Sequence, residues 1–312
     1  MNKKIYIIIA AFAALLTVSC MRDEILYPTS NYYLAFDLQH VVEKEAEAPQ
    51  IYMANFYNTV NGKLEYQEII RPHSHPPGMP VGGYIQGITP GQYHMVVYNF
   101  DTKKNIIENE NNYDYSYAHT KVLSYNGSTP IVITPDNLYV YSETIDIKYV
   151  TGENAYIIDC EPQLIVETWK LNVNGIKNIE KLVKMTVYIS GQVRGKYMKQ
   201  KNEKVDEKVI ICFDATPQTT KAGDIPETFS INYQTYGQIE NGQRVLVTVI
   251  AEGPDGSTYY AQEDVTKQIL DPSNENKEID IDADFKIEER KQGGFDPSAK
   301  EWDENRERWE IS

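Results

Sequence analysis

The sequence GITPGQYHMVVYNFDT, residues 87–102, joins a turn signal to a strand signal. Pro90 and Gly91 suit the two central positions of a type II turn, because proline fixes its φ angle and glycine accepts a positive φ. From Tyr93 to Val97 every second residue is then large and apolar, which is the pattern of a strand with one face on a core. This stretch predicts a turn that leads directly into a β-strand.

The same period of two recurs along the chain, in residues 34–38, 183–189 and 279–285. Only two short segments, 175–181 and 264–270, have a pattern that a helix could use. Asn-Gly, Pro-Gly and Asp-Gly dipeptides separate the strand-like segments at the spacing expected for β-sandwiches. The sequence therefore predicts an all-β chain built from antiparallel sheets, each with one face on a core.

The length and the charge of the chain narrow the classes of function. With 312 residues it exceeds the roughly 250 to 300 at which a single hydrophobic core usually divides, so two domains are expected. The formal net charge is −15, and it becomes −17 if the two lysines before Cys20 are removed. Such an acidic surface repels phosphate backbones and anionic headgroups, so we expect no nucleic-acid partner and no membrane contact through a basic face.

The amino terminus has the layout of an export signal. Two lysines precede an apolar run of about 14 residues, 5–18, which fits a signal peptide and is short of the ~20 needed to span a bilayer. Ser19-Cys20 follows and resembles a bacterial lipobox, in which the cysteine thiol is lipidated, although Thr17 stands where leucine is common. We expect residues 1–19 to be a signal peptide and Cys20 to carry a lipid that attaches the chain to a membrane.

The acidic pair Asp23-Glu24 allows two interpretations. It resembles the charged signal that carries lipoproteins of Bacteroidetes to the outer face of the outer membrane. A solvated linker explains the pair equally well.

A domain boundary is expected within residues 151–162, TGENAYIIDCEP, which follow a long strand-like segment and precede a new series. The tail after residue 287 is charged, yet it holds two tryptophans, which a disordered tail seldom has. The predicted organisation is a signal peptide (1–19), a lipidated linker (20–30), an N-terminal β-sandwich (31–150), a C-terminal β-sandwich (151–287) and a tail or added strand (288–312).

The sequence has no catalytic motif of the common kinds: no G-x-S-x-G elbow, no H-E-x-x-H, no phosphate-binding glycine loop and no C-x-x-C. His73 and His75 could bind a metal from one face of a strand, but a prolyl loop is a poor frame for fixed ligands, so a surface loop is expected there. The acidic alternation of residues 280–284 lacks the glycine and the glutamate of a calcium loop. We predict no catalytic residue, no cofactor and no metal site, and a hydrolase built on a carboxylate pair has little support.

Cys160 and Cys212 are the only cysteines besides Cys20. An exported location permits a disulfide between them. Cys212 lies in the strand-like VIICFD, where a buried free thiol is equally natural. The spacing leaves both alternatives open, a disulfide and two free thiols.

The loop NENNYDYSYAHT, residues 109–120, concentrates tyrosines. It could present aromatic faces and amides to a sugar or to another protein, since tyrosine offers amphipathic contact area. The alternative is a tyrosine-lined strand edge that packs on the rest of the first domain. Under the sugar hypothesis, Tyr113, Tyr115 and Tyr117 form the binding surface.

Several of these pieces occur in an order that resembles a known family. After Cys20 come MRDEILY, the turn and strand of residues 87–102, the tyrosine loop ending in Ala-His-Thr, and GGFDP with Glu301-Trp302 near the end. In this order they resemble the fimbrillin-type lipoproteins of Bacteroidetes, a group that overlaps with the anchor proteins that attach minor or major fimbriae to the outer membrane. The similarity extends over essentially the whole chain after Cys20.

The resemblance implies a non-enzymatic outer-membrane lipoprotein, held at the cell surface by lipid at Cys20, with two tandem transthyretin-like Greek-key β-sandwich domains. Its partners would be fimbrillin-like subunits, joined by a strand that one subunit inserts into its neighbour. We expect the C-terminal segment, with Phe295, Trp302 and Trp309, and a sheet edge that the sequence does not identify to form these contacts. A surface glycan-binding lipoprotein on the same kind of sandwich is the alternative.

Overall fold

The computed structural model describes residues 32–39, 48–72, 81–149, 155–199, 203–215, 228–239 and 243–288. Several predicted sites lie outside these residues: Cys20, His73, His75, Phe295, Trp302 and Trp309. Strands dominate the described part of the chain, which confirms the predicted all-β class. No helix in that part is long and apolar enough to cross a membrane.

The strands up to residue 150 are β1 (Tyr32–Phe36), β2 (Tyr52–Asn58), β3 (Leu64–Ile70), β4 (Gly82–Ile85), β5 (Gly91–Asn99), β6 (Asn105–Glu108), β7 (Tyr117–Thr120), β8 (Val122–Asn126), β9 (Thr129–Ile133) and β10 (Tyr139–Ile147). The later elements are β11 (Tyr156–Cys160), β12 (Gln163–Leu164), β13 (Glu167–Lys177), the 3₁₀ helix η1 (Ile179–Lys181), β14 (Lys184–Val193), β15 (Gly195–Tyr197), β16 (Lys208–Ala215), β17 (Phe229–Thr235), β18 (Leu246–Glu252), β19 (Thr258–Asp264), helix α3 (Thr266–Leu270) and β20 (Glu278–Lys286). Each of the two segments with a helical pattern contains a short helix.

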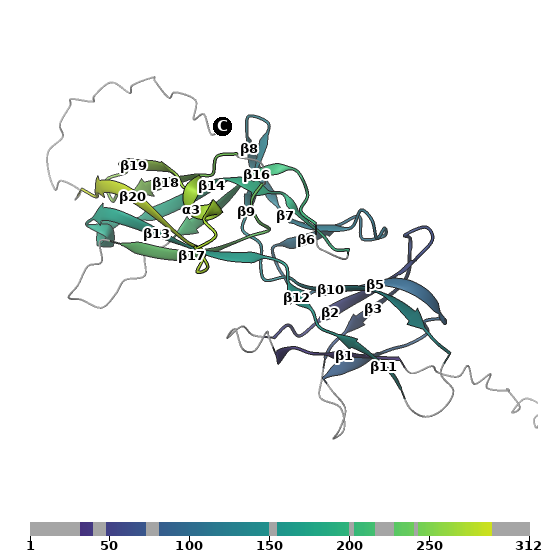
Figure 1. The fold of residues 1–312 in the computed structure, drawn as a ribbon. Helices are drawn as coiled ribbons and strands as arrows, with labels where there is room; N and C mark the ends of the chain where they lie inside the picture. The colour runs from purple at the N-terminus through teal and green to yellow at the C-terminus, as the bar shows by residue number, and fades with distance from the viewer. Residues whose placement is uncertain are drawn as a thin grey trace, which may run out of the picture.

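The first sandwich places a three-stranded sheet, in the order β11-β1-β4, against a five-stranded sheet, in the order β12-β10-β5-β2-β3 (Figure 1). Apolar side chains from both sheets form one core between them, and Leu34, Phe56 and Met95 are fully buried in it. The strand predicted at residues 93–97 is confirmed as β5, which turns its alternate side chains into this core.

Strand β1 is the central strand of the smaller sheet and is buried on both faces. The alternation of residues 34–38 predicts one solvated face, and this detail is wrong. Ala35 is buried, and Tyr33 packs edge-to-face on Tyr84 of β4 with ring centroids 5.0 Å apart. The pairing leaves little room, because a Cβ atom on Gly82 would lie 2.0 Å from the carbonyl oxygen of Leu34.

Three strand pairs among the described residues are parallel. β1 pairs with β11, from Tyr32 opposite Tyr156 to Phe36 opposite Cys160. The other two parallel pairs are β13 with β20 and β16 with β9. The prediction of antiparallel sheets therefore holds for the other strand pairs and is wrong for these three. Alternation reports which face of a strand is buried, and it carries no information on the direction of the neighbouring strand.

The second sandwich packs the sheet β17-β13-β20 against the sheet β19-β18-β14-β16-β9-β8 (Figure 1). Its core includes Leu171 of β13, Val187 of β14 and Val249 of β18. The predicted strand of residues 279–285 is confirmed as β20, which buries its isoleucines in this core and exposes the aspartates that alternate with them.

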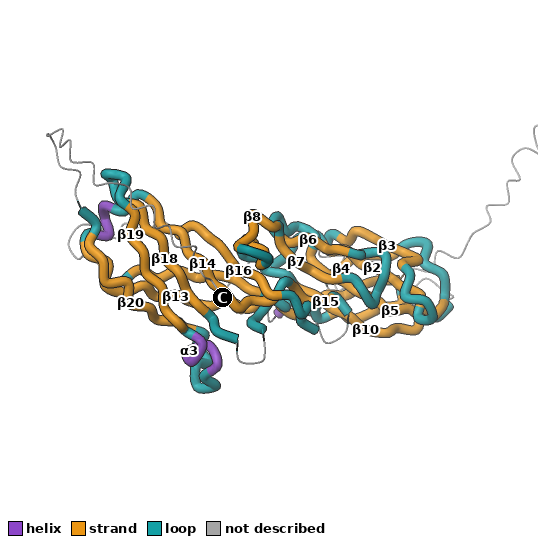
Figure 2. The backbone as a smooth tube through the Cα atoms, turned by 90° about the horizontal axis from the view of Figure 1, so that it is seen from above, coloured by secondary structure: helices purple, strands orange, loops and turns teal. Residues whose placement is uncertain are grey.

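A further small sheet, β15-β7-β6, lies between the two sandwiches, which are placed end to end in an elongated molecule (Figure 2). An apolar cluster at this junction combines Tyr57 and Tyr98 of the first sandwich with Val193, Met198 and Tyr236 from later in the chain. Strand pairs connect the two sides of the expected boundary. β11, which follows the boundary, pairs with β1 of the first sandwich, and β9, which precedes it, pairs with β16 of the second sandwich. The division into domains near residue 150 remains a prediction.

The loop before β5 differs from the predicted turn. Its residue in the left-handed region is Gly87, with φ at 81°, whereas Gly91 lies outside that region and is the first residue of β5. The hydroxyl of Tyr93 donates a hydrogen bond to the carbonyl oxygen of Thr89 at 3.1 Å and thereby holds the loop against the strand. A type II turn centred on Pro90 and Gly91 is therefore wrong.

The close approach of β4 to β1 predicts that Gly82→Ala destabilises the first sandwich. The added methyl group would overlap the carbonyl oxygen of Leu34, and overpacking of this kind typically costs about 1–3 kcal/mol. Denaturant unfolding followed by circular dichroism measures the loss. Gly91→Ala is the matched control, because its Cβ would meet only the Tyr93 ring at 3.5 Å. Equal unfolding midpoints for the two variants would contradict the tight pairing of β1 with β4.

Candidate partner-binding groove

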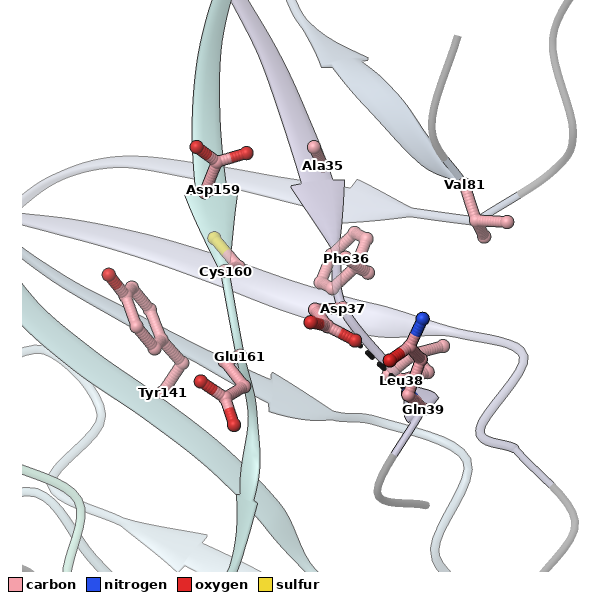
Figure 3. A pocket seen from close by; sticks show the side chains of 10 residues that line it. All are labelled: Ala35, Phe36, Asp37, Leu38, Gln39, Val81, Tyr141, Asp159, Cys160 and Glu161. Atoms are coloured by element: carbon pink, nitrogen blue, oxygen red, sulfur yellow. Dashed lines mark hydrogen bonds between the residues drawn. The ribbon is translucent and has the colours of Figure 1, made fainter. Parts of the chain in front are cut away.

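An open groove of about 880 Å³ lies where β1 and β11 end, at one end of the first sandwich (Figure 3). Side chains reach it from the end of β1 and the residues that follow, from the end of β11 and from β10. β11 is an edge strand, with a neighbour on one side only. The groove therefore lies beside a strand edge that is open within the described part of the chain.

The floor of the groove is apolar. Phe36 stacks on Tyr52 with ring centroids 4.5 Å apart, and the neighbouring Cys160 is only 1% exposed. The half-buried side chains of Leu38 and Tyr141 add further apolar surface. All of these side chains belong to the core of the first sandwich or pack on it, so the fold fixes their positions.

The rim of the groove is acidic. Asp37, Asp159 and Glu161 line it, and Glu143 accepts a hydrogen bond from the hydroxyl of Tyr141. Burial and the bond to Glu143 raise the pKa of Tyr141, so its hydroxyl remains a neutral donor. Among the described residues, none of these four carboxylates forms an ion pair. A segment that enters the groove meets an apolar floor and uncompensated negative charge.

The free edge of β11 offers backbone groups to a further strand. The amide of Asp37 donates to the carbonyl oxygen of Cys160 at 2.8 Å, so the backbone polar groups of Cys160 point toward β1. These groups alternate between the two sides of a strand, and those of Ile157 and Asp159 therefore point away from β1. One more strand can pair with β11 on that side.

The structure has Cys160 and Cys212 as free thiols, which is one of the two alternatives that their spacing leaves open. They lie on strands of different sheets, Cys160 on β11 and Cys212 on β16. Burial raises the pKa of the Cys160 thiol, and the nearby Asp159 and Glu143 raise it further. Cys160 is therefore a protonated wall residue of the groove and a poor nucleophile.

The tyrosine loop packs largely against its surroundings. Tyr113 is buried and stacks on His94 with ring centroids 4.3 Å apart, and Tyr117 donates a hydrogen bond to Glu108 at 2.5 Å. Only Tyr115, at 64% exposure, presents most of its surface to solvent. Tyr113 and Tyr117 therefore fit the alternative of a tyrosine-lined strand edge that packs on the rest of the domain. The three rings do not form one surface for a sugar.

The groove is a site that the sequence did not reveal. Its carboxylates come from residue 37 and residues 159–161, and the sequence indicated the second segment as part of a domain boundary and as the position of a possible disulfide cysteine. The apolar YIIDC of residues 156–160 is the signal that could have indicated β11. Within the described residues, no group of three or more His, Cys, Asp and Glu side chains is arranged to hold a metal ion.

Comparison with known families connects this fold to surface proteins. A family model described as a domain of unknown function, DUF5119, matches residues 19–214. The match covers well over half of the chain and includes each strand that lines the groove. The chain belongs to the DUF5119 family. This DUF5119 protein is also 25% identical over 286 residues to Fim4B of Bacteroides ovatus, a candidate fimbrium anchoring subunit, and the alignment covers 86% of this chain and 80% of Fim4B.

A solved structure shares the fold of the DUF5119 protein. A candidate adhesin from Bacteroides ovatus aligns with 87% of this chain and 98% of its own, with 19% identity and a TM-score of 0.55. The fimbrial anchor protein Mfa2 of Porphyromonas gingivalis aligns over 81% and 89%, with 14% identity and a TM-score of 0.46. The resemblance to fimbrial anchor proteins of Bacteroidetes, expected from the order of the motifs, is confirmed by the family match and by Fim4B.

The burial of Cys160 predicts a clear difference in thiol reactivity. In a Cys20→Ser variant, a maleimide should label the half-buried Cys212 slowly and should leave Cys160 unlabelled until the protein is unfolded. Mass spectrometry after labelling without a reductant, in buffer and in denaturant, measures both reactions. Two labels in denaturant confirm the free thiols, and no label in denaturant would reveal a disulfide and contradict the structure.

Proposed function

We propose that this protein is a lipid-anchored outer-membrane protein that holds fimbriae and helps to assemble them through strand-mediated contacts with fimbrial subunits. The observation that carries the proposal is the open edge of β11 beside a groove with an apolar floor. The relation to Fim4B, a candidate fimbrium anchoring subunit, supports this class of function. The proposed role requires no catalytic residue.

A fimbrial subunit would bind by adding a strand to β11. Its main chain would form hydrogen bonds with Ile157 and Asp159, which supplies affinity. Every second side chain would enter the groove above Phe36 and Cys160, which supplies specificity. Because the carboxylates of the rim have no ion pair among the described residues, the best partner strand is mainly apolar with a lysine or arginine at the rim.

Lipid at Cys20 would hold this anchor in the membrane after residues 1–19 are removed as a signal peptide. Each buried methylene contributes ~0.8 kcal/mol, so stable attachment needs more than one acyl chain. The acidic pair Asp23-Glu24 would direct the lipoprotein to the cell surface. All of these residues lie outside the described part of the chain.

The two sandwiches would be tandem transthyretin-like Greek-key domains, and their end-to-end placement supports two units (Figure 2). The predicted division between 31–150 and 151–287 would then be crossed by the pairs β1–β11 and β9–β16. The C-terminal segment with Phe295, Trp302 and Trp309 would provide a second contact with a subunit. A glycan-binding role is less well supported, because the tyrosines of the loop do not form one exposed surface.

Loss of the gene should leave cells without surface fimbriae or with fibres shed into the medium, and the wild-type gene should restore attached fibres. Ile157→Pro should fail in this rescue, because proline lacks the N–H group at the free edge of β11 and its ring obstructs an added strand. The pairing of β11 with β1 should persist, since the backbone groups of Ile157 point away from β1. Electron microscopy of cells and immunoblots of the medium measure attached and shed fibres.

Ile157→Thr is the matched control for this rescue, because threonine keeps the N–H group and is also β-branched. It should restore fimbriae, and both variants should reach equal amounts in the membrane fraction. Full rescue by Ile157→Pro would rule out the β11 edge as the binding site. Normal fimbriae on the deletion strain would instead rule out the anchor function itself.

Cys20→Ala should abolish acylation, because alanine has no thiol to receive the lipid. Metabolic labelling with an alkyne fatty acid measures acylation, and cell fractionation should show the protein leaving the membrane fraction. Cys212→Ala is the matched control and should keep both the label and the location. An acyl label that persists in Cys20→Ala would reject Cys20 as the attachment point.

A further inference from the structure

The end of the first sandwich opposite the groove exposes apolar side chains. β1 and β5 begin at this end and β2 and β10 finish there, as the pair Ile147–Gly91 shows. We call the turn 59–63, the loop 86–90 and residues 148–149 the tip. The tip lies at the end of the molecule that is away from β13, β14 and β18 (Figures 1 and 2).

Val60, in the turn of the tip, is 93% exposed. The side-chain oxygen of Asn58 accepts the N–H groups of Val60 at 2.8 Å and of Asn61 at 3.1 Å. The side-chain oxygen of Asn61 accepts the N–H group of Lys63 at 2.9 Å, and the carbonyl oxygen of Gly62 accepts a further bond from the tyrosine loop. A turn fixed by these bonds holds an apolar side chain outward.

Aromatic side chains lie at the same end of the sandwich as this valine. Tyr149, which follows β10, is 59% exposed. Only β5 lies between β10 and β2, so at the usual spacing of neighbouring strands the backbones of β10 and β2 are about 10 Å apart. Tyr156 is partly exposed and packs edge-to-face on Tyr32. The hydroxyl of Tyr32 donates to the carbonyl oxygen of Lys148 at 2.7 Å, which ties the start of β1 to this group. Tyrosine is enriched where membranes meet water.

The charges of the tip are mixed, in contrast to the net charge of −15 for the chain. Lys63 and Lys148 are exposed beside the apolar side chains and can contact lipid phosphates. Acidic groups are also present, with Asp114 at the turn and Glu65 and Asp146 along the adjoining strands. The tip therefore lacks the uniform negative charge that would repel a bilayer surface.

The chain also connects the tip to the proposed lipid. Tyr32 is the first residue of β1 and lies at the tip, and Cys20 precedes it by 12 residues, which span at most about 40 Å. A lipid on Cys20 is thus within this distance of the tip. β1 runs from the tip to the groove, so the groove opens at the opposite end.

We propose that the tip rests on the bilayer surface, with Val60 and Tyr149 inserted among the lipid headgroups. The protein then stands with the first sandwich at the membrane and the second sandwich further out. The inference rests on the lipid anchor of the proposed function: the acyl chains provide the attachment, and the tip sets the orientation. In this orientation the groove faces away from the bilayer, where a fimbrial subunit can reach it.

Photo-crosslinking tests this orientation. The photoreactive residue p-benzoylphenylalanine replaces Val60 or Tyr149 in the full acylated protein, reconstituted in vesicles of phosphatidylethanolamine and phosphatidylglycerol. Irradiation should give lipid adducts at both positions, detected by mass spectrometry. Leu270, at the end of α3 in the second sandwich, is 61% exposed and serves as the control position, where no lipid adduct is expected.

A second variant provides an independent readout. Val60→Asp should reduce the lipid adducts at position 149 several-fold while the acyl group on Cys20 remains. Absence of adducts at positions 60 and 149 in protein that is acylated would overturn the orientation and leave the anchor intact. In intact cells, adducts from position 60 to a protein in place of lipid would overturn it in favour of a protein contact. A chain without an acyl group would overturn both the anchor and the orientation.

Discussion

The parallel pairing of β1 with β11 is the constraint on which the first sandwich depends. No hairpin can form this pair, because parallel strands need a long crossover, and β2 to β10 all lie between the two strands in sequence. The pair fixes the register in which Phe36 meets Cys160 at one end and Tyr32 meets Tyr156 at the other. The pairing also leaves β11 as the edge strand of its sheet. The contact between β1 and β11 therefore determines the core, the groove at one end of the pair and the tip at the other.

Because β1 has five residues, a strand of about 16 Å separates two surfaces of different chemistry. At the tip, Val60 and Tyr149 are exposed beside lysines. At the groove, an apolar floor lies below carboxylates that form no ion pair within the described residues. If a fibre is held at the groove and lipid at the tip, the load runs along β1, and the hydrogen bonds of its ladders with β4 and β11 share that load.

The sequence predicted strands correctly where only one face of the strand packs on a core. β5 and β20 were predictable for this reason, since their alternate residues enter the cores of the two sandwiches. The neighbours of β1 were not predictable, because alternation does not encode the partner of a strand or its direction. Cys160 is an example. The segment around it was interpreted as a domain boundary, and the pairing of β11 with β1 is what places Cys160 in the wall of the groove.

The charge of the groove bears on what can occupy it. An apolar floor beside an open edge would accept many β-strands, including one from a second copy of this chain. The carboxylates of the rim change this, because a second copy has the same net charge of −15, and its last described strand, β20, repeats aspartate at every second position from Asp280 to Asp284. Repulsion between like charges therefore disfavours self-association and favours a partner with basic residues. If the groove holds a different subunit, as proposed, the acidic rim supplies the selectivity that the apolar floor lacks.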